Sequence, residues 1–321
     1  MVMRVLFLGT PGFAVPSLQA LLTLTNHDYE LVGVITQPDR PAGRGQNLTP
    51  PPVKVLAEQS GLPVFQSERL RSNQDAVEFL RARDPHLIVI AAFGQILTPE
   101  FFDYPPLGSL NVHASLLPKY RGAAPITHAL IQGETQTGIT IMKIDEGMDT
   151  GDILSQVTIT VGENVTGGEL EDILAHQGAE LLIRTIPPYA LGEMQPQPQD
   201  VKGATYAPRI TKQEAEIDWN RSAPEIHNWI RALDPWPTAW TRFGGKKVKI
   251  WRSEKVGELG RDLRPLGRPG AILALGKDRI IVECGGKTFL SLRELQLPSR
   301  ARLSARDFVN GVSPGLGDLF T

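Results

Sequence analysis

Cysteine is almost absent from this chain. Cys284 is the only one among 321 residues, which excludes an intrachain disulfide framework and a cysteine-rich metal site. This scarcity fits a reducing compartment. Cys284 also lies in a hairpin-like pattern without a nearby histidine, so we do not expect a catalytic thiol.

Long apolar runs are missing as well. The N-terminal run at residues 5–8 ends at Gly9, which is too short for a signal peptide or a membrane span. With 41% hydrophobic and 21% charged residues, the composition is that of a globular protein. We therefore expect a cytoplasmic protein without membrane contact, long enough for two domains.

The net charge of −2 conceals two halves of opposite sign. Residues 1–206 carry 13 basic and 22 acidic side chains, a net −9, whereas residues 207–321 carry 20 and 13, a net +7. The change of sign falls in the Pro/Gln-rich run at 192–208. The basic half is either a polyanion-binding domain or simply a solvated basic surface, and charge alone leaves both open.

The first half alternates short apolar runs with segments of helical period. This alternation predicts βαβ units around a mostly parallel, Rossmann-like sheet. The turn Gly9-Thr10-Pro11-Gly12 matches the dinucleotide motif only in part, so it does not indicate a nucleotide site. The expected strands are residues 5–9, 31–36 and 87–92, and the expected helices are residues 15–24, 53–59 and 75–83.

Three later segments have their own patterns. Residues 36–54 contain five prolines and no periodicity, which predicts a long irregular loop, either functional or a tolerated insertion. Residues 139–161 predict a long hairpin across an acidic turn. Residues 168–186 predict an amphipathic helix that ends before Pro187-Pro188.

The second half has the short period of antiparallel strands. After a helix expected at 223–233, Gly-rich turns separate strand-like runs. This spacing predicts a small β-barrel, of the OB-like kind that binds oligonucleotides. All five tryptophans fall in this half, where packing is the first expectation and base stacking the alternative; they are Trp219, Trp229, Trp236, Trp240 and Trp251.

Asn111 and His113 are the first candidates for chemistry. Side chains two apart on a strand share a face, so the amide and the imidazole would lie side by side. The amide suits a developing oxyanion, and the imidazole moves protons near neutral pH. Two buried polar residues that satisfy each other would show the same spacing, so the pattern alone leaves both interpretations open.

An acidic, glycine-containing segment follows at residues 145–152. Its spacing lacks the order of a calcium-binding EF-hand loop, so we expect no metal. One of its acids could instead lie beside His113 and favour the imidazolium form. Ser115 shares the His113 face, but no G-x-S-x-G elbow surrounds it as a nucleophile would require.

Several long motifs resemble one enzyme family. They are NVHASLLPKYRGAAPITHALIQG, GITIMKIDEGMDTGDIL, TYAPRITKQEAEIDW and LDPWPTAW, with TQPDRPAGRG earlier in the chain. Together they resemble the methionyl-tRNA formyltransferase family over essentially the whole chain. The first two also resemble other enzymes that use 10-formyltetrahydrofolate, so the remaining motifs narrow the choice.

The resemblance implies transfer of a formyl group from 10-formyltetrahydrofolate to the methionine of initiator methionyl-tRNA, by a monomer without metal. It implies a catalytic domain at 1–191, a linker at 192–208 and an OB-like tRNA-binding barrel at 209–321. It implies catalysis by Asn111, His113 and Asp149, and tRNA contact through Arg40 and Arg44. The implied folate-binding residues are Ser115, Leu116, Leu117, Pro118, Phe93, Ile96, Leu97 and Gly147.

Two other functions fit parts of the sequence. A folate-dependent formyltransferase for a nucleotide or an amino sugar could share the first half, but it gives no reason for a +7 second half. A non-catalytic RNA-binding protein with a degenerate enzyme fold would be expected to lose Asn111, His113 and Asp149, which are all present. The roles of Lys119 and Arg121 stay open between a phosphate contact and a structural salt bridge.

Overall fold

The computed structural model describes residues 2–24, 28–43, 45–256 and 264–321. The chain divides into two compact units, each with its own sheet. The first unit comprises residues 1–125, 136–160 and 171–208, and the second comprises residues 126–135, 161–170 and 209–321.

A seven-stranded sheet in the order β5-β2-β1-β6-β7-β8-β9 forms the centre of the first unit. Its strands from β5 to β7 pair in parallel, and β8 and β9 add an antiparallel hairpin. The predicted Rossmann-like sheet and the predicted hairpin at 139–161 are confirmed. The strands are β1 (Met3–Gly9), β2 (Tyr29–Thr36), β5 (Val64–Gln66), β6 (Leu87–Ala91), β7 (Ser109–His113), β8 (Gln136–Lys143) and β9 (Ile153–Thr160).

Helices cover this sheet, and the three predicted in the first 100 residues are confirmed. A side chain caps α3, because Asn73 Oδ1 accepts from the Ala76 amide at 3.2 Å. The helical elements are η1 (Gly12–Ala14), α1 (Val15–Leu24), α2 (Pro52–Gln59), α3 (Gln74–Arg83), α4 (Pro99–Phe102), η2 (Val201–Gly203) and α6 (Gly167–Ala190), of which α6 begins in the second unit and continues in the first.

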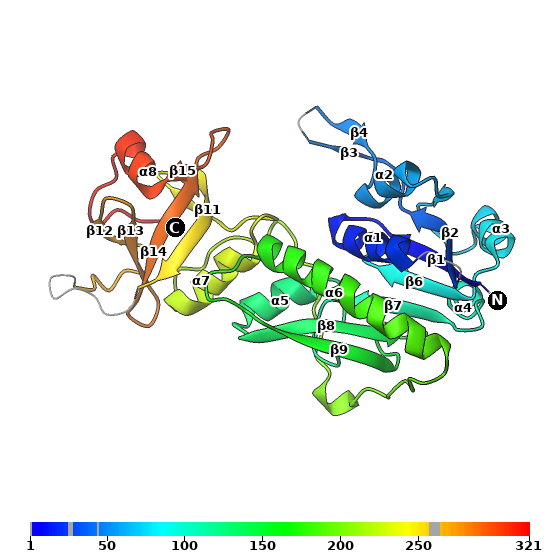
Figure 1. Ribbon diagram of the computed structural model, residues 1–321. Coiled ribbons are helices and arrows are strands. Elements are labelled where there is room, and N and C mark those ends of the chain that lie inside the picture. Colours follow the sequence, from blue (N-terminus) through cyan, green and yellow to red (C-terminus); the bar gives the residue numbers. More distant parts are fainter. Residues whose placement is uncertain (1, 25–27, 44, 257–263) are drawn as a thin grey trace. The chain divides into compact units, whose positions relative to one another are not determined.

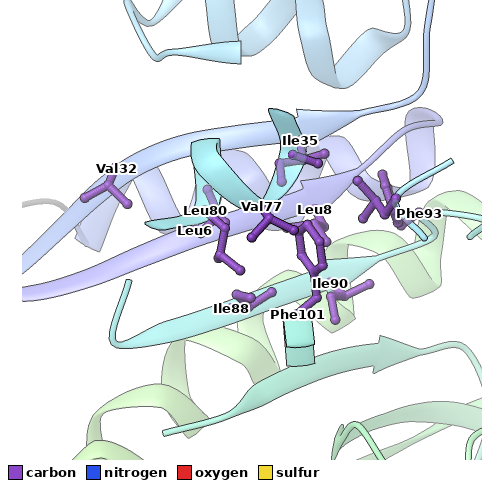
Figure 2. Close-up of a cluster of buried hydrophobic side chains, with 12 residues drawn as sticks. Leu6, Leu8, Val32, Ile35, Val77, Leu80, Ile88, Ile90, Phe93 and Phe101 are labelled. Carbon is purple, nitrogen blue, oxygen red and sulfur yellow. The ribbon is translucent and has the colours of Figure 1, made fainter. Parts of the chain in front are cut away.

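Alternate residues of neighbouring strands build the core on one face of the sheet. Leu6 and Leu8 of β1 lie beside Ile88 and Ile90 of β6, because residues two apart point the same way (Figure 2). Helix α3 covers them with three buried side chains, and α4 adds Phe101. The helical residues of the cluster are Ala76, Val77, Leu80 and Phe101.

The end of α6 differs from the prediction. The helix runs on to Ala190 and includes Pro187 and Pro188, where we expected it to stop. A proline inside a helix lacks the N–H donor and its ring crowds the carbonyl four residues earlier, but its own carbonyl still accepts. The Leu191 amide donates to the Pro187 carbonyl at 3.1 Å, and the Glu193 amide to the Pro188 carbonyl at 2.9 Å. The two prolines therefore fit the last turn without breaking it.

Residues 36–54 also differ from the prediction, because they contain a short hairpin. Strand β3 (Arg40–Ala42) pairs antiparallel with β4 (Asn47–Thr49), and the hairpin projects away from the sheet (Figure 1). Asp39 anchors its base, accepting from Lys54 Nζ at 3.0 Å and from Gln66 Nε2 at 2.8 Å. These hydrogen bonds lower the pKa of Asp39. Strands of three residues are too short to show a period in the sequence.

The second unit has an antiparallel sheet in the order β10-β11-β14-β13-β12, with β15 beside β14. Its helices are α5 (Pro125–Ile131), α7 (Ala223–Ala232), close to the predicted 223–233, and α8 (Ala305–Val312). The strands are β10 (Trp240–Phe243), β11 (Lys246–Lys255), β12 (Ile272–Leu275), β13 (Ile280–Cys284), β14 (Thr288–Gln296) and β15 (Leu303–Ser304).

The C-terminal residues join the two edges of this sheet. Thr321 exchanges both backbone hydrogen bonds with Arg242 at the β10 edge, at 2.7 and 2.9 Å. The Phe320 amide donates to the Gly270 carbonyl at 2.9 Å, just before β12. The predicted small β-barrel is therefore confirmed, and the tail after α8 closes it.

Most tryptophans of the second unit are packed, as first expected. Trp219 is buried and donates from Nε1 to Thr241 Oγ1 at 2.9 Å, and Trp251 donates to Gln296 Oε1 at 2.9 Å. Trp240 is buried too, whereas Trp236 is half exposed. In the part of the chain that is described, no helix has both the length and the apolar character needed to cross a membrane.

The first unit should depend strongly on the cluster under α3. Leu80 is fully buried there, so Leu80→Ala should lower the free energy of unfolding by about 2–5 kcal/mol. Leu191 in the same unit is 73% exposed, and Leu191→Ala is the matched control. Urea unfolding followed by far-UV circular dichroism measures both. Equal losses for the two variants would contradict the importance of this cluster.

Cys284 should be chemically silent in the folded protein. It is 1% exposed on β13, and burial, with a smaller contribution from Glu283, raises the pKa of its thiol to about 12. A disulfide reagent such as DTNB should not react with the native chain at about pH 8, because the thiolate is the nucleophile. It should react fully after denaturation. Fast reaction of the native chain would show that the thiol is accessible.

Candidate active site

Asn111 and His113 lie at the end of β7, the last parallel strand of the sheet, which pairs parallel with β6 and antiparallel with β8. Ligands of open α/β sheets bind at the carboxyl ends of the strands, and His113 is the last residue of β7. The register pairs Asn111 with Met142 and His113 with Thr140 on β8. The two candidate side chains are thus on one face of the strand, as the spacing predicts.

The imidazole of His113 is 94% buried and has a partner at each nitrogen. Nε2 lies 3.0 Å from the carbonyl oxygen of Tyr120, and because a carbonyl oxygen only accepts, Nε2 bears the proton. Nδ1 faces Asp149 Oδ1 at 3.6 Å. The ring therefore has a carbonyl oxygen on one side and a carboxylate oxygen on the other.

Asp149 is the acid of the 145–152 segment that reaches His113. Its backbone has a φ of 53°, in the left-handed region that Asp tolerates better than most residues. Its Oδ2 accepts from the Gly122 amide at 2.8 Å, which leaves Oδ1 toward the histidine. Asp145, by contrast, accepts from Gly147 N and Thr150 Oγ1 within its own turn.

The side chain of Asn111 complements this pair. It is partly buried, and no hydrogen bond joins its carboxamide to any residue that the structure describes. An amide without a protein partner on the His113 face has a donor free for a bound group. This is the arrangement expected of an oxyanion donor.

Residues 115–118 form a tightly held turn beside His113. Thr140 Oγ1 donates to the Ser115 carbonyl at 2.7 Å and accepts from the Leu117 amide at 3.1 Å. Gln156 Nε2 donates to the Leu117 carbonyl at 2.9 Å. Ser115 is fully buried and its hydroxyl donates to the Lys119 carbonyl at 2.6 Å, so the structure does not favour it as a nucleophile.

Gly138 leaves room for Leu116 in this turn. A Cβ at Gly138 would lie 2.0 Å from the Val157 carbonyl oxygen and 2.6 Å from Leu116 Cδ2. Leu116 itself is partly buried, as is Pro118, while Leu117 is buried. The 115–118 turn therefore has a defined shape in which no side chain is fully exposed.

The other predicted folate-contacting residues lie in different environments. Phe93 is buried in the hydrophobic cluster under α3, and its carbonyl accepts from Gln37 Nε2 at 2.9 Å (Figure 2). Leu97 packs against the same cluster. Ile96 is 87% exposed, and Gly147 is exposed in its turn. Among these, Ile96 is the side chain placed to contact a ligand from solvent.

The two arginines predicted to contact tRNA belong to the 36–54 segment. Arg40 lies on β3 and its exposed guanidinium is 3.1 Å from Glu68 Oε1. Arg44 lies outside the described residues.

Residues after 192 contribute to this site, although the sequence suggested only a linker there. The Arg121 amide donates to the Thr205 carbonyl at 2.8 Å, and the Ala207 amide to the Arg121 carbonyl at 2.7 Å. Arg121 is 4% exposed, and its guanidinium donates to Gln199 Oε1. The observed partner of Arg121 is an amide, so neither a phosphate nor a salt bridge describes it. No periodicity in the Pro/Gln-rich run could have indicated this.

Within the described ranges, no three His, Cys, Asp or Glu side chains gather in a way that could hold a metal ion. The donors and acceptors around His113 are instead two backbone groups and two side chains, namely Tyr120 O, Gly122 N, Asp149 and Asn111.

Comparison with known proteins agrees with this architecture. The family described as formyl transferase matches residues 3–186, and its C-terminal domain family matches residues 209–313. HypX from Aquifex aeolicus in complex with tetrahydrofolic acid has a TM-score of 0.65 at 17% identity, covering 100% of this chain and 51% of that chain. Methionyl-tRNA formyltransferase from Clostridium thermocellum has a TM-score of 0.55 at 18% identity, covering 79% and 93%. These two likenesses concern the fold.

Sequence identity to a curated relative is much higher. Methionyl-tRNA formyltransferase from Halalkalibacterium halodurans is 47% identical over 314 residues, which cover 98% of this chain and 96% of the relative. With both domain families matched in order and nearly the full length aligned, this chain belongs to the methionyl-tRNA formyltransferase family.

Proposed function

We propose that this chain transfers the formyl group of 10-formyltetrahydrofolate to the α-amino group of methionine on initiator methionyl-tRNA, with Asn111, His113 and Asp149 as its catalytic residues. The observation that carries the proposal is His113 held between the Tyr120 carbonyl and Asp149, with the Asn111 carboxamide on the same face and not hydrogen-bonded to any described residue. We expect the enzyme to act as a monomer in the cytoplasm, which sedimentation and cell fractionation would test.

The chemistry requires little help from a strong base. An α-amino group titrates at about 8, and the neighbouring ester of methionyl-tRNA withdraws electrons and lowers that pKa, so a substantial fraction of the nucleophile is neutral at physiological pH. The folate co-substrate supplies the formyl carbon: the amine nitrogen forms a bond to it, and its bond to N10 breaks. The amine loses a proton and N10 gains one, so the protein must move a proton and stabilise the formyl oxygen.

The site residues divide these tasks. Asn111 donates to the formyl oxygen as negative charge develops on it. His113 Nδ1 lies 3.6 Å from Asp149, beyond hydrogen-bond distance, so its proton is not committed to the carboxylate. Nδ1 is the nitrogen that passes a proton, while Nε2 remains bound to the Tyr120 carbonyl and fixes the ring. Asp149 stabilises the charged ring.

The Ser115–Pro118 turn and Ile96 are proposed to contact the folate. The turn is held rigid by Thr140 and Gln156, and Ile96 offers an exposed apolar side chain. Leu97, Gly147 and the backbone of Phe93 complete the proposed boundary of the pocket. The buried Phe93 side chain would support the pocket from the core rather than contact its ligand.

The second unit is proposed to bind the tRNA through cations that lie on or over β10 and β11. Arg242 and Lys247 are directly opposite each other, and like charges in such a pair repel. Lys247 Nζ lies 3.8 Å above the Trp240 ring, and the Arg302 guanidinium 3.3 Å above the Trp251 ring. A phosphate backbone would relieve the repulsion among these cations.

Lys249 extends the same cationic group. Burial, and then the charges of Lys247, Arg302 and Lys212, lower the pKa of its ammonium. A bound anion would favour the charged form again. The basic hairpin with Arg40 and Arg44 is proposed to contact the acceptor end, and the domain roles at 1–191 and 209–321 follow from these assignments.

An assay that compares formyl transfer to charged tRNA with transfer to its two components tests the function. The purified protein should formylate methionyl-tRNA with 10-formyltetrahydrofolate, and should leave deacylated tRNA and free methionine unchanged. Transfer to an amino sugar or to a nucleotide instead would reject the proposed substrate.

His113→Ala should reduce kcat by roughly 100- to 10,000-fold with little change in either KM, because a positioned proton transfer is lost. Asn111→Ala should reduce kcat by about 100- to 1,000-fold, the usual loss for one oxyanion donor. His176 is exposed on α6, so His176→Ala is the matched control. Near-normal turnover by His113→Ala would contradict the assignment of His113 as the proton-transfer residue.

Removing two cations from the second unit should weaken tRNA binding without changing folate binding. For Lys247→Gln with Arg302→Gln, the salt dependence of tRNA affinity should become shallower by about one unit per lost phosphate contact. Arg40→Gln should likewise raise KM for methionyl-tRNA only. Lys287→Gln, on an exposed turn of the same unit, is the control. An unchanged salt slope would exclude this surface as the tRNA contact.

A further inference from the structure

Residues 199–207 lie directly against residues 120–124 of the first unit, the segment that follows the 115–118 turn. The backbone of Arg121 pairs with Tyr206 in a parallel bridge, and the Ala124 amide donates to the Ala207 carbonyl at 3.1 Å. The Tyr120 amide donates to Thr205 Oγ1 at 2.8 Å. Tyr120 is the residue whose carbonyl accepts from His113, so this segment fixes the position of the acceptor that holds the histidine ring.

Gln199 is the central side chain of this support. Its Oε1 accepts from Arg121 Nε at 3.1 Å and from Nη2 at 2.7 Å. Its Nε2 donates to the Asp149 carbonyl at 2.9 Å and to the Gly151 carbonyl at 2.7 Å. Because a guanidinium only donates and carbonyls only accept, these partners fix which end of the amide is which.

The Asp149 turn needs such a support. Asp149 has a left-handed backbone, and a Cβ at Gly151 would lie 2.0 Å from the Lys143 carbonyl oxygen, so the turn is closely packed. Gln199 holds the Asp149 carbonyl, and the Gly122 amide holds its Oδ2. With both ends fixed, Oδ1 is directed at His113.

We propose that Gln199 is a positioning residue for formyl transfer, which acts by holding the Asp149 turn and Arg121 in register behind His113. This inference rests on the proposed catalytic role of His113 and Asp149. Among the described residues, the Gln199 side chain is hydrogen-bonded to Arg121, Asp149 and Gly151 and not to His113 or Asn111, so its effect passes through the Asp149 backbone.

A merely structural role is the alternative to be tested. Arg121 is a buried cation, and Gln199 could serve only to give it an acceptor. Gln199→Glu separates the two roles, because a carboxylate still accepts from Arg121 but no longer donates to Asp149 and Gly151. Gln199→Ala removes both interactions.

We expect kcat to fall by about 10- to 100-fold in both variants, the scale of a misplaced catalytic group, with both KM values unchanged. Gln197→Ala is the matched control, since the one hydrogen bond of the exposed Gln197 side chain to a described residue is to the Gln195 carbonyl, at 3.2 Å. Wild-type kcat in Gln199→Glu would overturn the proposal and reduce Gln199 to a partner of Arg121. If Gln199→Ala does not fold, Gln199→Glu decides.

A second readout is independent of turnover. The ¹⁵N shift of His113 Nδ1 reports its carboxylate neighbour, so it should move in Gln199→Glu and stay in place in Gln197→Ala. If the wild-type chain does not formylate methionyl-tRNA but this shift moves, positioning stands and the proposed function falls. If the wild type is active but the shift does not move in Gln199→Glu, the positioning role of Gln199 is rejected and the proposed function is retained.

Discussion

The loops around β7 compensate for burial of the His113 imidazole: Nε2 donates to the Tyr120 carbonyl at 3.0 Å, and the Asp149 carboxylate lies 3.6 Å from Nδ1 as a charged neighbour. A buried polar group without a partner is costly, so the Tyr120 carbonyl and the Asp149 carboxylate define where the ring lies. Each of these partners comes from an irregular segment rather than from the sheet. The site therefore combines Asn111 and His113 on a rigid strand with Tyr120 and Asp149 on loops that need their own supports.

Those supports depend on unusual backbone conformations. Asp149 has a φ of 53° and Gly122 a φ of 118°, both in the left-handed region. A Cβ at Gly122 would lie 2.8 Å from the Ala207 carbonyl oxygen, so a glycine is needed where the 199–207 segment passes. At this close approach the Gly122 amide faces Asp149 and donates to the Asp149 Oδ2.

The second unit uses charge in a different way. Its barrel is closed by backbone pairing of the C-terminal residues, and its cations lie over buried tryptophans on β10 and β11. Lys247 lies opposite Arg242 on neighbouring strands, a pairing that costs stability in the isolated protein. A bound anionic partner would offset this repulsion between cations. The net charge of +7 on residues 207–321 is consistent with such a partner.

Local patterns predicted much of the fold. Buried apolar runs such as residues 87–91 predicted the strands, and helical period predicted α1 to α3. The predicted end of α6 was wrong because the carbonyls of Pro187 and Pro188 still accept hydrogen bonds, so the last turn continues through them. The β3–β4 hairpin was missed because three-residue strands show no period.

The sequence by itself determined that Asn111 and His113 share a face, because strand geometry alternates over two residues and needs no distant contact. Only the tertiary structure decided what surrounds them. Gln199 binds Arg121 across 78 positions of the chain and the Asp149 carbonyl across 50. It does so from a Pro/Gln-rich run without any regular pattern. Hydrogen bonds between such distant segments depend on how the whole sheet and its loops fold, and no local spacing encodes them.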